Sequence, residues 1–120
     1  MSVVRLNEVI EKMKLENLTP EIDTSGIKVR QPDINRPAIQ MTGYFDHMAQ
    51  ARIQIMGFVE YTYMESLSVK KKKEAYEQLL SYDIPAVDFC RELIPDEIFL
   101  EMAVAHNIPV LMTKKSTSAK

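Results

Sequence analysis

One cysteine, Cys90, and two histidines, His47 and His106, are the side chains most suited to nucleophilic catalysis in this sequence. A cysteine becomes a nucleophile for acyl transfer when a histidine lies within hydrogen-bonding reach. Cys90, however, ends a short apolar run, and a lone cysteine in that position is typical of a small buried hydrophobic residue. We therefore interpret Cys90 as a packing residue, and a small enzyme that uses it as a nucleophile is retained as an alternative.

The surroundings of the two histidines favour structural roles. His106 falls in the expected last turn of a helix, where a histidine commonly interacts with the helix dipole or a free carbonyl. His47 follows Asp46, a pair that suggests acid–base chemistry, but the sequence identifies no third partner. We interpret His47 as a surface residue and predict no catalytic residue.

Cofactor and metal motifs are missing from the sequence. Phosphate-binding loops and dinucleotide fingerprints need closely spaced glycines, whereas Gly26, Gly43 and Gly57 are 17 and 14 residues apart. A single cysteine allows neither an internal disulfide nor a cysteine-rich zinc site. We predict no cofactor-binding residue and no metal site in this chain.

The length of 120 residues indicates one domain, and the single cysteine fits a reducing compartment. The 15 basic and 17 acidic residues give a net charge of −2, so nucleic acid and anionic membranes are disfavoured as partners. Lysines 70–73 are interpreted as a solvated face, because no aromatic residues interleave with them. No run approaches the roughly 20 apolar residues of a membrane span, and no signal peptide is recognised. We expect a cytoplasmic protein.

The first half of the chain contains weaker structural signals. Ser2 can cap a helix whose apolar positions are Val3, Leu6, Val9, Ile10 and Met13. Alternation predicts a strand at 27–29, with 15–18 as its expected partner, and a half-buried strand at 52–56 that stops at Gly57. Between them, residues 35–46 are expected to form a structured loop.

The second half of the chain contains stronger signals. Ser68 is expected to cap a helix over 69–80, with a core face that uses Val69, Ala75, Tyr76, Leu79 and Leu80. Apolar runs at 84–87 and 108–111 flank a second helix, which starts at Pro95 and Asp96 and ends at a left-handed Asn107; its expected buried stripe is Ile98, Phe99, Met102 and Ala103. This pattern predicts a β-α-β unit with two parallel neighbouring strands.

Several linked motifs closely resemble the N-terminal domain of HPr kinase/phosphorylases. They occur in the expected order, and the similarity extends over essentially the whole chain: residues 33–46 (DINRPAIQMTGYFD), 51–57 (ARIQIMG), 79–85 (LLSYDIP), 106–111 (HNIPVL) and 116–118 (STS). Two features depart from the family pattern, namely the lysine run and the sequence of residues 87–90 (VDFC). They leave room for a divergent member.

The resemblance implies a small α/β domain with a mostly parallel or mixed sheet flanked by helices, similar to the N-terminal domain of certain Mur ligases. It assigns residues 1–113 to this domain and 114–120 to a tail or linker that precedes an absent catalytic domain. That second domain would use ATP and magnesium to phosphorylate a serine of HPr, and would reverse the reaction with inorganic phosphate. The implied partners are the catalytic domain of the same chain, further copies in a homo-oligomer, and HPr itself.

The role of this domain would be accessory, in the regulation or assembly of an enzyme of carbon catabolite control. Arg36, Tyr44 and Asp46 form the candidate interaction surface, since they lie beside the chain-directing Pro37 and Gly43. The alternative is that Arg36 simply pairs with a nearby carboxylate. A free-standing sensor domain that binds a small ligand or a protein is the competing hypothesis for the whole chain.

Overall fold

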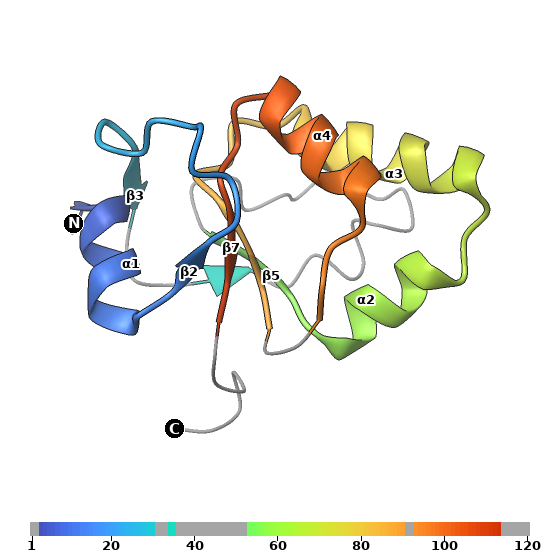
Figure 1. The fold of residues 1–120 in the computed structure, drawn as a ribbon, viewed down its shortest axis with the longest axis horizontal. Coiled ribbons are helices and arrows are strands. Elements are labelled where there is room, and N and C mark those ends of the chain that lie inside the picture. The colour runs from blue at the N-terminus through green and yellow to red at the C-terminus, as the bar shows by residue number, and fades with distance from the viewer. Residues whose placement is uncertain (1–2, 31–33, 36–52, 91–92, 114–120) are drawn as a thin grey trace.

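The protein has three layers, because side chains on the two faces of a central sheet form two separate buried clusters that other elements cover (Figure 1). The structure is a computed structural model that describes residues 3–30, 34–35, 53–90 and 93–113. The middle layer is a five-stranded sheet with the order β2 (Glu16–Asn17), β7 (Val110–Met112), β6 (Val87–Phe89), β5 (Ile53–Met56) and β4 (Ile34–Asn35). Neighbours from β4 to β7 are parallel, and β2 pairs antiparallel with β7. The α/β class and mixed sheet are confirmed.

Helix α1 (Leu6–Met13) and a small second sheet cover one face of the central sheet. That sheet pairs β1 (Val3–Arg5) antiparallel with β3 (Lys28–Arg30). Leu6 of α1 and Val29 of β3 are buried against the central strands. The cluster beneath them contains Ile53, Ile55, Ala86, Cys90 and Leu111.

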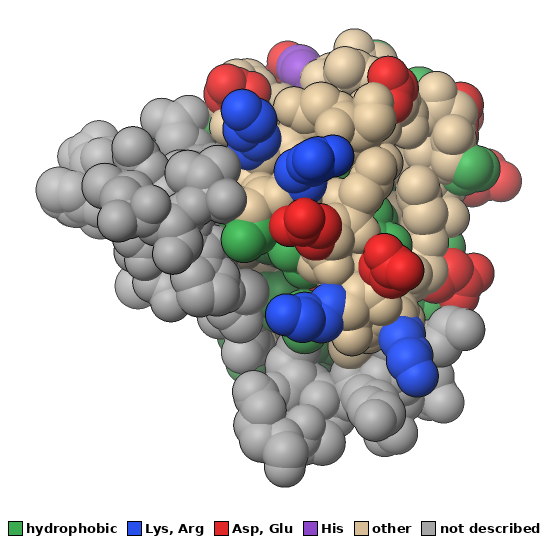
Figure 2. Space-filling model, turned by 90° about the vertical axis from the view of Figure 1, so that its left-hand side faces the viewer, with side chains coloured by type: hydrophobic (Ala, Val, Ile, Leu, Met, Phe, Trp, Pro, Cys, Tyr) green, Lys and Arg blue, Asp and Glu red, His purple; other side chains and the backbone are tan. Residues whose placement is uncertain are grey.

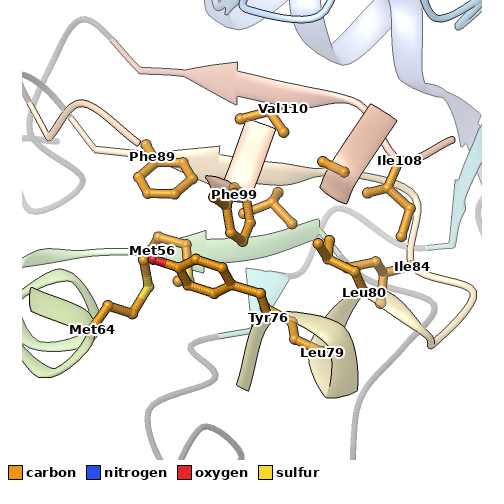
Figure 3. Close-up of a cluster of buried hydrophobic side chains, with 12 residues drawn as sticks. Met56, Met64, Tyr76, Leu79, Leu80, Ile84, Phe89, Phe99, Ile108 and Val110 are labelled. Carbon is orange, nitrogen blue, oxygen red and sulfur yellow. The ribbon is translucent and has the colours of Figure 1, made fainter. Parts of the chain in front are cut away.

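Helices α2 (Phe58–Glu65), α3 (Val69–Leu80) and α4 (Glu97–Ala105) cover the opposite face. Figure 3 shows their side chains meeting those of the strands, with Phe99 of α4 near Phe89 of β6 and Tyr76 of α3. The Phe99 ring makes edge-to-face contacts with Tyr76 and Phe89, with ring centroids 5.0 Å and 5.2 Å apart. This is the geometry that aromatic quadrupoles favour.

The N-terminal predictions need correction. Val3 belongs to a strand, and the helix begins only at Leu6, where Arg5 at the N-cap makes no side-chain hydrogen bond to the helix. Met13 is 60% exposed and does not join the core. The strand predicted at 27–29 exists as β3, but its partner is β1; residues of the segment 15–18 pair with β7 instead. Strand partners far apart in sequence are not visible in local periodicity.

Strand β5 and the segment after it also differ from the prediction. Ile53, Gln54, Ile55 and Met56 are all buried, because layers cover both faces of a parallel sheet. Helix α2, which was not predicted, follows immediately, and the Glu60 carboxylate accepts a hydrogen bond from the Gly57 N–H at 2.9 Å. Asn35, expected in a loop, lies in β4.

The second half follows its prediction in the order of its elements, but the strands β6 (Val87–Phe89) and β7 (Val110–Met112) begin two to three residues after the starts of the predicted runs 84–87 and 108–111. Helix α3 spans Val69–Leu80, and the Ser68 side chain accepts from the Lys71 N–H. Strands β6 and β7 are parallel neighbours with α4 between them in sequence, and Asn107 is left-handed with φ 61°. One core assignment is wrong: Val69, in the first turn of α3, is 58% exposed.

Candidate functional site at the carboxyl edge of the sheet

The carboxyl ends of the parallel strands β5, β6 and β7 lie at one edge of the sheet. Met56 at the end of β5 leads into α2, Phe89 at the end of β6 leads into the segment before α4, and β7 ends before Thr113. The Thr113 N–H donates to the Phe89 carbonyl at 2.8 Å, which ties the last described residue to the end of β6. Ligands of open α/β sheets commonly bind at this edge.

Asp88 is an ionisable group buried in the middle of this sheet. It lies on β6 between Ile55 of β5 and Leu111 of β7, and only 3% of its surface is exposed. Its Oδ2 accepts a hydrogen bond from the Thr113 hydroxyl, whereas Oδ1 has no hydrogen-bond partner. Burial raises the pKa of Asp88 from 3.8 to about 6, and the hydrogen bond from Thr113 opposes that rise.

Asp96 joins the helices of the opposite face near the same edge. Its Oδ1 caps α4 by accepting from the Phe99 N–H at 2.8 Å, and its Oδ2 accepts from the Tyr76 hydroxyl at 2.9 Å. The Lys72 ammonium lies 3.3 Å from the same Oδ2 and 3.9 Å from Glu65. Burial is the main cause that raises the pKa of Tyr76, and the hydrogen bond to Asp96 is the second. These contacts fix α4 to α3, which is a structural role.

The lysine run is only partly the solvated face that the sequence predicts. Lys70, Lys71 and Lys73 are exposed, but the Lys72 side chain is only 16% exposed because it reaches Asp96. On the face that carries α1, acidic and basic side chains intermingle (Figure 2).

Cys90 and His106 lie at opposite edges of the sheet. Cys90 directly follows β6 at the carboxyl edge and is buried, as the packing interpretation predicts. His106 ends α4 before β7 begins, and its Nε2 lies 3.0 Å from Oε1 of Glu77 on α3. The ring therefore faces a carboxylate of the neighbouring helix, where the sequence predicted a dipole or carbonyl contact. A Cys90–His106 nucleophilic pair is inconsistent with this topology.

The remaining predicted residues cannot be placed in this site. Arg36, Tyr44, Asp46 and His47 lie outside the described residues. Within the described ranges, no three His, Cys, Asp or Glu side chains gather as metal ligands, and no helix has both the length and the apolar character to cross a bilayer.

Sequence reasoning assigned no role to Asp88. It also did not identify Asp96 as the acceptor of hydrogen bonds from three donors. The signal for Asp88 was present, since one acidic residue interrupts the apolar run from Ile84 to Cys90. An acidic residue in a buried parallel strand is unusual enough to single out. Asp96 was identified only as the start of a helix, because its contacts with Tyr76 and Lys72 connect distant parts of the sequence.

Comparison with known proteins agrees with this architecture. The fold is similar to a solved structure of the CBS and DRTGG domains of the regulatory region of Clostridium perfringens pyrophosphatase, complexed with diadenosine tetraphosphate. The superposition covers 94% of this chain and 42% of the pyrophosphatase chain. The TM-score is 0.59 and the sequence identity is 14%. This likeness concerns the fold alone.

Sequence relatives are more specific. The chain is 43% identical over 119 residues to the HPr kinase/phosphorylase of Lachnoclostridium phytofermentans, and 33% identical over 118 residues to those of Alkaliphilus metalliredigens and Streptococcus pneumoniae. These matches cover 98–99% of this chain but only 38% of each relative. The family model described as HPr Serine kinase N terminus matches residues 4–119, so the chain belongs to the family of HPr serine kinase N-terminal domains.

Proposed function

We propose that this chain is the accessory, regulatory N-terminal domain of a bifunctional HPr serine kinase/phosphorylase and has no catalytic activity by itself. The observation that carries this proposal is the match over 99% of the chain to only 38% of the relative from L. phytofermentans. The wide spacing of the three glycines supports a non-catalytic role, because a phosphate-binding loop needs them close together.

The complete protein would act in the cytoplasm, in carbon catabolite control of the sugar phosphotransferase system. Its catalytic domain would use ATP and magnesium to phosphorylate a serine of HPr, and inorganic phosphate to reverse that reaction. The N-terminal domain would support assembly of a homo-oligomer or modulate regulation. Its partners would be the catalytic domain of its own chain, other copies of the protein, and HPr.

The mass of the native protein in its source cells tests this proposal first. An antibody against residues 1–113 should detect a species well above the 13.8 kDa of this chain. Detection at 13.8 kDa would contradict the proposal and favour a free-standing sensor domain that binds a small ligand or protein.

Activity measurements then separate the two parts of the protein. The full-length protein should transfer phosphate from ATP to HPr, and residues 1–120 alone should not. A fragment that lacks residues 1–113 should retain phosphoryl transfer but change its oligomeric state or its response to effectors. Unchanged assembly and regulation in that fragment would rule out the accessory role.

Arg36, Tyr44 and Asp46 remain the proposed interaction surface of the domain. Replacing each with alanine in the full-length protein should alter assembly or regulation while the rate of phosphoryl transfer persists. If all three variants assemble and respond as the wild type does, the residues serve only the local structure of the segment 35–46.

A further inference from the structure

Three large apolar side chains are exposed at the carboxyl edge of the sheet. Phe58 and Val59, at the start of α2, are 72% and 61% exposed, and Ile94, between β6 and α4, is 60% exposed. Strands β5 and β6 are parallel neighbours, so the segments that follow them leave the same edge. We call Phe58, Val59 and Ile94 the edge patch.

Direct contacts connect the two segments of the edge patch. The Tyr61 hydroxyl of α2 donates to the Ile94 carbonyl at 2.9 Å, and the Tyr61 ring packs edge-to-face with Phe89 at 6.5 Å. Phe58 lies three positions before Tyr61, so the two are neighbours on the helix surface. The edge patch is therefore continuous with the core on this side of the sheet, through the partly buried Tyr61 and Leu93.

Thr113, the last described residue, lies at this same edge. Thr113 is bonded to Phe89 through its backbone, and Figure 1 shows the end of β7 and the start of α2 on the same lower side of the molecule. Seven residues, 114–120, follow Thr113. At the maximum extension per residue they span about 25 Å. A domain that follows residue 120 would begin within that distance of Thr113.

We propose that the edge patch is the docking surface for an apolar face of the domain that follows residue 120 in the full-length protein. This inference rests on the proposed function, and on relatives of which this chain spans only 38%. Three side chains are too few for the roughly 1,000 Å² that a stable interface between free proteins buries. A tethered domain needs far less area, because its effective concentration is in the millimolar range. The area therefore favours the tethered domain over a second copy of this chain.

Hydrogen exchange in the full-length protein and in residues 1–120 tests the edge patch. Amides of residues 58–61 and 93–94 should exchange at least threefold more slowly in the full-length protein than in the isolated chain. Phe58→Ser or Ile94→Ser in the full-length protein should restore the faster exchange. Met13→Ser and Val69→Ser are matched controls, since these side chains are 60% and 58% exposed away from the patch, and should leave the protection intact.

Each contrary result has a distinct meaning. A full-length protein that phosphorylates HPr but shows equal exchange at the patch in both forms would overturn the docking surface and leave the proposed function standing. Patch protection that appears in residues 1–120 alone, rises with concentration and disappears with Phe58→Ser would assign the surface to a second copy and also overturn the inference. A native mass of 13.8 kDa would remove the proposed function and the inference together.

Discussion

Two aspartates eight positions apart in the sequence, Asp88 and Asp96, have very different environments in the fold. Asp96 accepts hydrogen bonds from a backbone amide, a tyrosine and a lysine, whereas Asp88 accepts one from Thr113 and leaves Oδ1 unpartnered. A buried carboxylate with few donors resists ionisation, which explains its raised pKa. At the scale of single residues, tertiary contacts rather than residue type decide what each carboxylate does.

Asp88 should make the stability of the domain depend on pH. Its pKa in the folded state, about 6, exceeds its ordinary value of 3.8, so the folded protein binds this proton more tightly than the unfolded chain does. The stabilisation is present below about pH 4 and is lost as the pH rises through 6, a difference of about 3 kcal/mol. Urea unfolding from pH 4 to 7.5 should show this fall in the wild type relative to Asp88→Asn.

Asp23 provides a control of opposite sign. Hydrogen bonds from the backbone and side chain of Ser25 lower its pKa, so its contribution to stability should be lost as the pH falls. The Asp23→Asn variant should therefore still lose stability as the pH rises through 6, as the wild type does. Parallel pH profiles for the wild type and Asp88→Asn would show that Asp88 titrates normally.

At the scale of elements, the start of α4 depends on more than a local cap. Asp96→Ala should remove the cap on Phe99 and leave the buried Tyr76 hydroxyl without its acceptor. The expected loss is about 2–4 kcal/mol of unfolding free energy. Ser68→Ala, which removes only the exposed cap of α3, should cost about 1 kcal/mol or less. Equal losses in denaturant unfolding would mean that Asp96 is a cap and nothing more.

The end of α4 depends on a left-handed backbone at Asn107, where φ is 61°. Asparagine tolerates this conformation and glycine adopts it freely, whereas alanine is strained. Asn107→Gly should leave the melting temperature nearly unchanged, and Asn107→Ala should lower the unfolding free energy by about 1 kcal/mol. If alanine proves as stable as glycine, the turn into β7 does not require the left-handed residue.

At the scale of the whole molecule, we propose that Thr113 marks the C-terminal boundary of the domain. Its N–H bonds Phe89 and its hydroxyl bonds Asp88, whereas residues 114–120 offer no large apolar side chain. A chain of residues 1–113 should have an unfolding free energy within about 0.5 kcal/mol of that of the 120-residue chain. Removal of Thr113 as well should cost a further 1–3 kcal/mol or so. Destabilisation by the first truncation would move the boundary beyond residue 113.

Local patterns were sufficient for α3, for α4 and for the parallel pairing of the strands around α4, but not for the bounds of those strands. Ser68, Asp96 and Asn107 act within a few residues of themselves, so their effects can be recognised along the sequence. The same patterns predicted a buried Cys90 and an α/β fold, and linked motifs indicated the family that residues 4–119 match.

Long-range contacts decided the rest. Nothing near residues 27–29 indicates that β3 pairs with β1, and nothing within residues 53–56 indicates that layers bury both faces of β5. Likewise, the edge patch exists only because parallel pairing places the ends of β5, β6 and β7 together. Strand partners and shared edges arise when distant segments meet, and the free energy that selects them comes from burial, which periodicity within one segment does not encode.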